Sequence, residues 1–320
     1  MEARPLGGSG IEVSRLVLGC GNFGGIGSAP AFFGQGESRD EAFALMDAAW
    51  EAGITTFDTA DAYGGGRSEA WIGEWLAAKG PDVRERIVLS TKVFHSVEGD
   101  ANDHGLAPER VRRAVEASLR RLGVERIDMY LTHEPDPDVP IAETLGVFDE
   151  LVAAGVVGAY GVSNVDGPQL EAAIQGGSPQ WVQNSYSLLD REPEREVLPL
   201  CERHGLGFTP FGPLSGGWLA GRYRRDAPPP EGSRMTLRPE PYRHLEDARV
   251  FDGLDALTRA AEERGASLPQ LAFAWLLSDP RVTAVIVGPR RPAQLEPALA
   301  ALDLQLSAAE RAELASSVAR

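Results

Sequence analysis

Short, nearly continuous apolar runs alternate with longer amphipathic stretches along the whole chain. The apolar runs are rich in Val, Ile, Phe, Tyr and Thr and mostly end in Gly, Asn or Pro, which is typical of strands buried on both faces. They predict strands at Arg15–Gly19, Thr55–Thr59, Arg86–Val93, Ile127–His133, Ala159–Ser163, Trp181–Ser187, Gly207–Phe211 and Ala284–Gly288. The amphipathic stretches predict helices at Ser38–Ala52, Ser68–Ala78, Pro108–Leu122, Pro140–Ala154, Gly167–Gln175, Glu192–His204 and Phe251–Arg264. The first of these helices opens with a capping box, Ser38 followed three residues later by Glu41.

A helix after nearly every buried strand predicts a parallel α/β sheet covered by helices. Eight such units suit a single (β/α)8 TIM barrel, and no linker interrupts the alternation, so we expect one domain over residues 1–320. Residues 1–14 are expected to form a short N-terminal hairpin across the bottom of the barrel. Two Pro-rich stretches, Pro228–Pro230 and Pro239–Pro241, mark a long loop at about 216–248, after strand 7.

The formal charge, 31 − 47 = −16, gives the chain no general attraction for nucleic acid or anionic lipid, so any phosphate must be bound locally. No apolar run approaches the ~18 residues that span a membrane, and the first residues lack the apolar core of a secretory signal. Two cysteines, Cys20 and Cys201, cannot build a disulfide framework. We therefore expect a cytoplasmic protein with reduced thiols and with no nucleic-acid or membrane partner.

Polar residues follow three successive predicted strands, where the carboxyl ends of barrel strands collect functional groups. Asp58, Lys92 and His133 end strands two to four, and Tyr63 lies in the loop after the first of these. A buried lysine needs a carboxylate, and Asp58 would supply it. A charged lysine is expected to lower the pKa of the phenol of Tyr63 from its usual ~10, making it a proton donor near neutral pH. With His133 orienting a carbonyl oxygen, this set predicts hydride addition to a carbonyl.

Each of these residues alone has a plainer interpretation, as a cap, a buried hydrogen-bonding group or a packed ring. Their order at one barrel face favours catalysis, and Lys92 is one of only two lysines in the chain. A metal-dependent hydrolase using Asp58, Asp61 and His133 is a competing class. The chain has no His-x-His or paired-His set, so no metal site is expected.

The segment Phe57–Gly64 with Ser68–Glu69, then Ser90–Lys92, then His133, resembles the aldo-keto reductase superfamily, and the resemblance extends over essentially the whole chain. It implies a catalytic tetrad. Tyr63 would be the general acid and base, Lys92 and Asp58 would tune it, and His133 would position the carbonyl.

The same resemblance implies a nicotinamide cofactor. Phe211 would stack on the nicotinamide ring, backbone N–H groups of Pro213–Gly217 would hold the pyrophosphate, and the guanidinium of Arg290 would bind the 2′-phosphate of NADP. NADPH is therefore expected, while Pro297 and Ala298 replace the family's usual Glu-Asn and leave NAD open. The candidate cofactor-binding residues are Gly21, Asn22, Phe23, Asp58, Ser163, Asn164, Gln183, Phe211, Pro213, Leu214, Ser215, Gly216, Arg222, Arg234, Gly288, Arg290 and Gln294.

The run Gly19–Gly24 has G-x-G-x-x-G spacing, but no helix begins before Ser38, so it predicts a loop at the barrel mouth rather than a dinucleotide fingerprint. Phe32 and Phe33 are expected to add apolar walls to the pocket and His95 a polar one. The chain reaches Arg320 soon after its last predicted helix, so we expect it to lack the long C-terminal substrate loop of the steroid- and aldose-reducing relatives and to have an open, permissive pocket. The candidate substrate-binding residues are Asn22, Phe23, Tyr63, Phe94, His133 and Glu134.

These observations predict an NADPH-dependent enzyme that reduces an aldehyde or ketone to an alcohol. The alternative is a redox-sensing or regulatory subunit that binds a nicotinamide cofactor with little turnover. The substrate, the direction of the reaction and the oligomeric state stay open.

Overall fold

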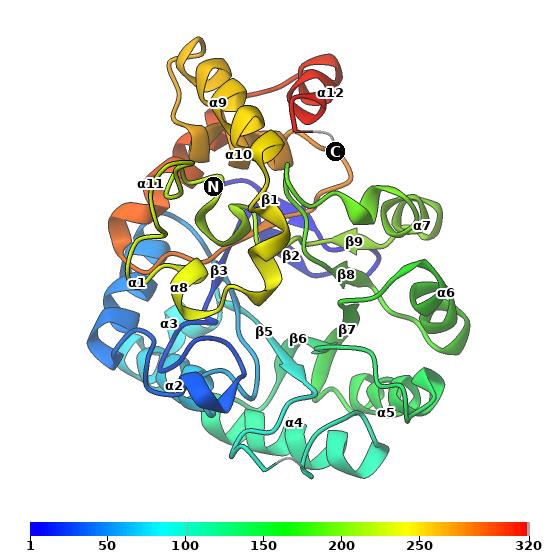
Figure 1. Cartoon of the computed structure of the whole chain (residues 1–320). Coiled ribbons are helices and arrows are strands. Elements are labelled where there is room, and N and C mark those ends of the chain that lie inside the picture. Colours follow the sequence, from blue (N-terminus) through cyan, green and yellow to red (C-terminus); the bar gives the residue numbers. More distant parts are fainter. Residues whose placement is uncertain (101, 319–320) are drawn as a thin grey trace.

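The computed structural model describes residues 1–100 and 102–318. Eight parallel strands form one curled sheet in the order β10-β3-β4-β5-β6-β7-β8-β9, and helices surround it (Figure 1). The two outer strands of this order are also linked, because Thr283 N donates to Phe208 O at 2.8 Å and Ile286 N donates to Pro210 O at 2.9 Å. Because all eight strands are parallel, their carboxyl ends face one side of the curled sheet.

The parallel strands are β3 (Leu16–Gly19), β4 (Thr56–Asp58), β5 (Val88–Val93), β6 (Ile127–Thr132), β7 (Val157–Ser163), β8 (Trp181–Gln183), β9 (Gly207–Phe208) and β10 (Val285–Val287). The α-helices are α1 (Arg39–Glu51), α2 (Arg67–Lys79), α3 (Pro81–Arg84), α4 (Pro108–Leu122), α5 (Ile141–Ala153), α6 (Gly167–Gly176), α7 (Val197–His204), α8 (Arg234–Leu237), α9 (Ala248–Glu262), α10 (Leu268–Leu277), α11 (Glu296–Ala300) and α12 (Ala308–Ser316). Within the described ranges, no helix is long and apolar enough to cross a membrane.

The eight predicted strands and the order of the predicted helices agree with the structure, and the capping box of Ser38 and Glu41 is confirmed. Strand β8 is shorter than predicted, because only an isolated bridge, Ser185 to Phe211, continues the pairing beyond it. The predicted helix at 192–204 is split into a 3-10 turn, Glu192–Glu194, and α7. Helix α10 was not predicted, because it is apolar on nearly every side and so lacks an amphipathic period.

An antiparallel pair, β1 (Ala3–Pro5) with β2 (Glu12–Ser14), lies against the amino ends of the strands. Leu6 and Val13 are fully buried in an apolar cluster that also contains Met129, Leu131 and Trp181. Gly7 has φ +53°, and a Cβ there would lie 2.1 Å from the carbonyl oxygen of Gln180, so only glycine fits. The pair fills the amino end of the sheet, which leaves the carboxyl end for a site.

The segment predicted as a long loop at 216–248 contains two short helical pieces, α8 and a 3-10 turn at Glu240–Leu245. Arg234, the first residue of α8, donates from Nη2 to Oδ1 of Asn22 at 2.7 Å. This bond joins the segment to the loop after β3, across the carboxyl end of the sheet.

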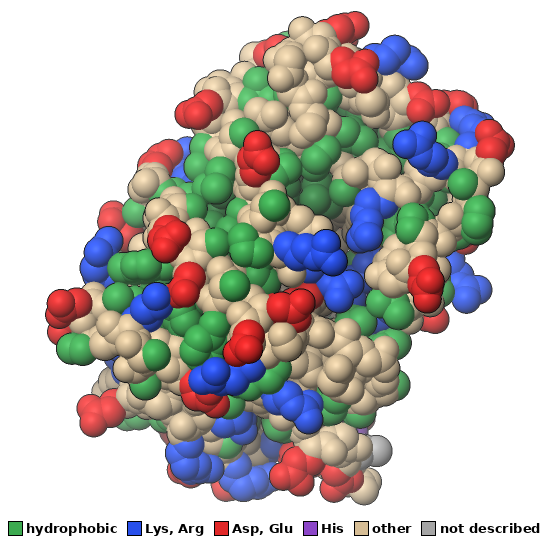
Figure 2. All heavy atoms as spheres, turned by 90° about the vertical axis from the view of Figure 1, so that its left-hand side faces the viewer, with side chains coloured by type: hydrophobic (Ala, Val, Ile, Leu, Met, Phe, Trp, Pro, Cys, Tyr) green, Lys and Arg blue, Asp and Glu red, His purple; other side chains and the backbone are tan. Residues whose placement is uncertain are grey.

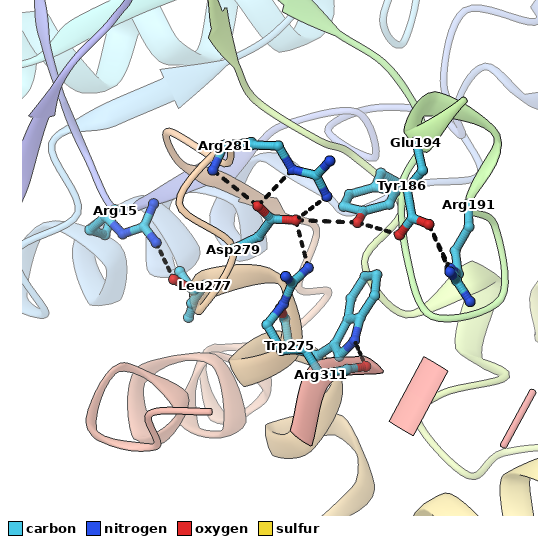
Figure 3. A network of polar contacts seen from close by, with 9 residues as sticks. All are labelled: Arg15, Tyr186, Arg191, Glu194, Trp275, Leu277, Asp279, Arg281 and Arg311. Carbon is cyan, nitrogen blue, oxygen red and sulfur yellow. Dashed lines mark hydrogen bonds and ion pairs between the residues drawn. The ribbon is translucent and has the colours of Figure 1, made fainter. Parts of the chain in front are cut away.

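A buried polar network holds the last helices against the sheet (Figure 3). The carboxylate of Asp279, which is 0% exposed, pairs with Arg281 at 2.8 Å and with Arg311 of α12 at 2.6 Å. Tyr186, after β8, donates to Glu194 at 2.8 Å and contacts Asp279 at 3.4 Å. Each buried charge has an opposite partner, which offsets the cost of removing it from water.

Candidate active site

Four side chains from three neighbouring strands and one loop converge at the carboxyl end of the sheet. Asp58 ends β4, Lys92 lies on β5, His133 follows β6, and Tyr63 lies between β4 and α2. Lys92 Nζ donates to Asp58 Oδ2 at 2.6 Å, and Tyr63 Oη lies 3.4 Å from Nε2 of His133. The structure thus brings the predicted catalytic residues together.

The pair of Lys92 and Asp58 is almost fully buried, with side chains 1% and 6% exposed. Lys92 also donates to the carbonyl oxygen of Thr59 at 2.7 Å, while Asp58 Oδ1 accepts from Ser90 Oγ at 2.9 Å and from Gln183 Nε2 at 3.0 Å. Burial lowers the pKa of Lys92, but the charge of Asp58 opposes it, and the pKa ends above its ordinary value. The ammonium is therefore charged at neutral pH.

The ring of Tyr63 lies with its centre 5.1 Å from Nζ of Lys92. The prediction that Lys92 lowers the pKa of Tyr63 below its ordinary value was wrong. Burial is the largest influence and raises the pKa of this phenol, because a phenolate loses its hydration there; the charge of Lys92 only partly opposes this. Tyr63 is therefore fully protonated at neutral pH, as a proton donor must be.

His133 is held by its backbone, whose N–H donates to Val93 O and whose carbonyl accepts from Asn164 Nδ2, both at 2.9 Å. Burial, then the charges of Lys92 and His95, lower the pKa of the imidazole well below its ordinary value. A neutral imidazole offers one N–H donor. The hydroxyl of Tyr63 and the imidazole of His133 lie side by side, so they can act on the same small group in the cavity.

A cavity of about 1940 Å³ is lined by Asp58, Tyr63 and His133 and extends to the loop after β10. Its lining also contains Tyr242, Arg238 and Pro30, which the sequence analysis missed, and the predicted His95. The predicted site residues that line it are Gly21, Asn22, Asp58, Tyr63, Phe94, His133, Glu134, Ser163, Asn164, Gln183, Phe211, Pro213, Leu214, Gly216, Arg222, Arg234, Gly288, Arg290 and Gln294.

Lys92, buried in its pair with Asp58, and four predicted pocket residues lie outside this lining. Phe23 is 1% exposed and packs in the core, because its backbone bridges to Glu37 in a tight loop. Phe32 and Phe33 are absent from the lining as well. Ser215 is 5% exposed, and its hydroxyl lies 2.7 Å from that of Ser187. Phe23 and Ser215 therefore contribute packing rather than pocket surface.

Asp61 is 1% exposed and does not line the cavity. Neither of its carboxylate oxygens has a hydrogen-bond partner among the described residues. Burial, reinforced by the nearby charge of Glu69, raises the pKa of this carboxyl to about 8. Asp61 thus does not share the cavity lining with Asp58 and His133.

Four arginines, Arg222, Arg234, Arg238 and Arg290, make part of the cavity lining basic. Figure 2 shows Lys and Arg side chains gathered near the middle of one face, on the side where α1, α8 and α11 lie. Gly216 adopts φ +65°, and a Cβ there would lie 2.7 Å from the ring of Tyr242, so the backbone approaches the cavity closely. A partly basic cavity of this size can hold a dinucleotide, with its phosphates near the arginines.

Glu37 does not line the cavity but pairs with one of these arginines, a contact that the sequence did not predict. Its carboxylate accepts a hydrogen bond from Arg290 Nε at 2.7 Å. The two residues are 253 positions apart, so no local pattern connects them.

The comparisons with known proteins agree with this geometry. A family model described as Aldo/keto reductase family matches residues 15–319. The chain is 34% identical to the NADH-specific methylglyoxal reductase of Escherichia coli, over 97% of this chain and 96% of that protein. It is 32% identical to a probable voltage-gated potassium channel subunit beta of Arabidopsis thaliana, over 95% and 92%. The structure of the glycerol dehydrogenase AKR11B4 from Gluconobacter oxydans superposes with a TM-score of 0.83 at 28% identity, over 99% of this chain and 95% of that one. This chain belongs to the aldo/keto reductase family.

Proposed function

We propose that this protein is an oxidoreductase that reduces an aldehyde or ketone to an alcohol with a nicotinamide dinucleotide. The observation that carries the proposal is that Asp58, Tyr63 and His133 line one cavity while Lys92, paired with Asp58, lies buried beside the ring of Tyr63. When bound, the dinucleotide would supply the hydride. Arg290 taken alone predicts NADPH, and the likeness to an NADH-specific reductase leaves NADH open.

Each residue of the tetrad has a defined task in this proposal. Tyr63 Oη and His133 Nε2 bind the carbonyl oxygen, and Tyr63 delivers its proton there as the alkoxide develops. Lys92 then stabilises the phenolate, because its charge lies 5.1 Å from the ring centre. Asp58 keeps Lys92 charged and in place. In the dry site these charges act more strongly than they would in water.

The proposed substrate is a small polar carbonyl compound. His95 and Glu134 lie at the cavity wall beside His133, with His95 Nε2 3.2 Å from Glu134 Oε1. This pair offers hydrogen bonds to a hydroxyl or second carbonyl next to the reacting group. The names of two similar proteins, a methylglyoxal reductase and a glycerol dehydrogenase, support this class of substrate.

The test is turnover of methylglyoxal and glyceraldehyde with NADPH and with NADH, in the wild type and in Tyr63→Phe. Loss of the general acid should lower kcat at least ~100-fold and leave the Kd for the dinucleotide within about twofold. Tyr130→Phe is a matched control, because this buried hydroxyl has no hydrogen-bond partner among the described residues and lies outside the cavity lining. Full activity in Tyr63→Phe would refute the assignment.

A redox-sensing or regulatory subunit is the second candidate function, favoured by the 32% identity to a probable potassium channel subunit beta. This function requires dinucleotide binding but little turnover. Tight binding without turnover of any tested carbonyl compound would favour it over the reductase.

The closed barrel, the single domain and the location in the cell are part of the same proposal. The hydrogen bonds between β9 and β10 support a closed (β/α)8 barrel, which we take as one domain over residues 1–320. A cytoplasmic location with a small-molecule partner is consistent with two buried free cysteines, Cys20 and Cys201.

A further inference from the structure

Arg290 lines the cavity, and its positive charge is already paired with the carboxylate of Glu37. Its Nε donates to Glu37 Oε1 at 2.7 Å, and the side chains are 43% and 2% exposed, respectively. The other carboxylate oxygen of Glu37 is buried without a hydrogen-bond partner among the described residues. Glu37 therefore depends on Arg290 for most of the stabilisation of its negative charge.

The position of Glu37 is fixed by its backbone. Glu37 N donates to Asn22 O at 2.9 Å, and Gly24 N donates to Glu37 O at 3.0 Å. The preceding residue is packed equally tightly, since a Cβ on Gly36 would lie 1.9 Å from the carbonyl oxygen of Asn22. Glu37 cannot follow Arg290 outward, so a ligand that draws Arg290 away leaves a buried carboxylate without its counter-charge.

The pair has consequences for the ligand that Arg290 can accept. The positive charge of Arg290 is cancelled by Glu37, although its remaining N–H groups are still donors. Donors without net charge suit a neutral hydroxyl. A phosphate dianion would both lose the charge of Arg290 and lie near the carboxylate of Glu37, which repels it.

We propose that Glu37 determines cofactor specificity: through its hold on Arg290 it weakens binding of a dinucleotide with a 2′-phosphate relative to one with a free 2′-hydroxyl. The inference rests on the proposed function, because it assigns Arg290 to the adenosine end of the dinucleotide. It reverses the NADPH preference that Arg290 alone predicts. The wild type should bind NADH at least as tightly as NADPH.

The experiment is a fluorescence titration of the purified protein with NADPH and NADH, in the wild type and in Glu37→Gln. The amide keeps an oxygen for Arg290 Nε but removes the negative charge. We expect the Kd for NADPH to fall on the order of tenfold, with the Kd for NADH unchanged within about twofold. In the double variant Glu37→Gln, Arg290→Ala this gain should disappear.

Glu41→Gln is the matched control. Glu41 is exposed, its charge also acts on Arg290, and glutamine preserves the capping box with Ser38. Both Kd values should stay within about twofold of the wild type in this variant.

Three results would overturn this inference without refuting the proposed function. In one, the wild type binds NADPH more than tenfold tighter than NADH, a measurement that needs no variant. In the second, Glu37→Gln shifts both Kd values together or neither. In the third, the gain survives removal of Arg290. A wild type that binds neither dinucleotide would instead refute the proposed function, and this inference with it.

Discussion

The buried pair of Lys92 and Asp58 makes a quantitative prediction about stability. Three donors point at the carboxylate of Asp58: Lys92 Nζ at 2.6 Å, Ser90 Oγ at 2.9 Å and Gln183 Nε2 at 3.0 Å. The Asp58→Asn variant has one acceptor oxygen instead of two, so its amide N–H₂ must face a donor. It also leaves the ammonium of Lys92 buried without a counter-charge, among neutral groups such as Thr59 O and Tyr63. Breaking such a pair from one side costs about 3–5 kcal/mol.

Removing both charges should cost less than the two single losses combined. Lys92→Met alone leaves a buried carboxylate with two neutral donors, and should cost a similar amount. The double variant Asp58→Asn, Lys92→Met leaves no unpaired charge. We expect its loss of unfolding free energy to be about 2–3 kcal/mol smaller than the sum of the single losses.

Urea unfolding followed by tryptophan fluorescence measures the unfolding free energies of the two single variants and the double variant against the wild type, provided that the m-values of these proteins agree. Lys79→Met is the control, because the other lysine of the chain is paired with Asp47 at 2.7 Å at the surface, where the side chains are 35% and 42% exposed. It should change the unfolding free energy by less than about 0.5 kcal/mol. Additive losses in the double variant, or Asp58→Asn as stable as the wild type, would refute the reasoning.

Three further predictions concern groups away from the tetrad. The pKa of Asp61 is about 8 in the folded protein and ~3.9 in an unfolded chain, so its contribution to stability is complete below about pH 4 and is lost as the pH rises toward 8. Asp61→Asn should therefore flatten the decline in unfolding free energy between these pH values. Equal slopes in the variant and the wild type would contradict the assignment. Asp279→Asn should lower the unfolding free energy by about 3 kcal/mol, measured by urea unfolding, because two arginines lose their shared carboxylate. Gly7→Ala should lower the melting temperature more than Gly10→Ala, since both have positive φ but only the first Cβ would collide with a neighbour; equal losses would remove the argument from close packing.

The sequence predicted the elements whose pattern is local. Strands buried on both faces are apolar runs in any fold of this kind, and capping boxes such as that of Ser38 and Glu41 need only four residues. Helix α10 escaped prediction for a related reason, because burial on nearly every side removed the polar face that marks a helix. Phe23 was assigned to the pocket because it lies in a glycine-rich loop at the barrel mouth. The loop does lie there, but its backbone bridge to Glu37 accompanies a buried ring.

The tetrad could be predicted because three strand ends and one loop meet in any parallel barrel, whatever the loops do. The electrostatics of the same residues could not. The sequence shows that a lysine is near Tyr63 but contains no measure of how much water is excluded, and exclusion of water proved the larger influence on the pKa of the phenol. The pKa of His133 follows the same rule, with burial first and the charge of Lys92 second.

Cofactor choice is the clearest case of a property held in non-local contacts. The sequence presents Arg290 as a basic residue in the right segment, but the binding of a phosphate depends on how much of its charge is left unpaired. That amount is set by Glu37, which two loops bring to Arg290 from 253 positions away. Arg234 is likewise engaged, through Asn22 of the loop after β3. In our proposal, the loop that begins at Gly19–Gly24 therefore does act on the dinucleotide, although its glycines do not bind the phosphates. Instead, Asn22 and Glu37 of this loop are the partners of the arginines that face those phosphates.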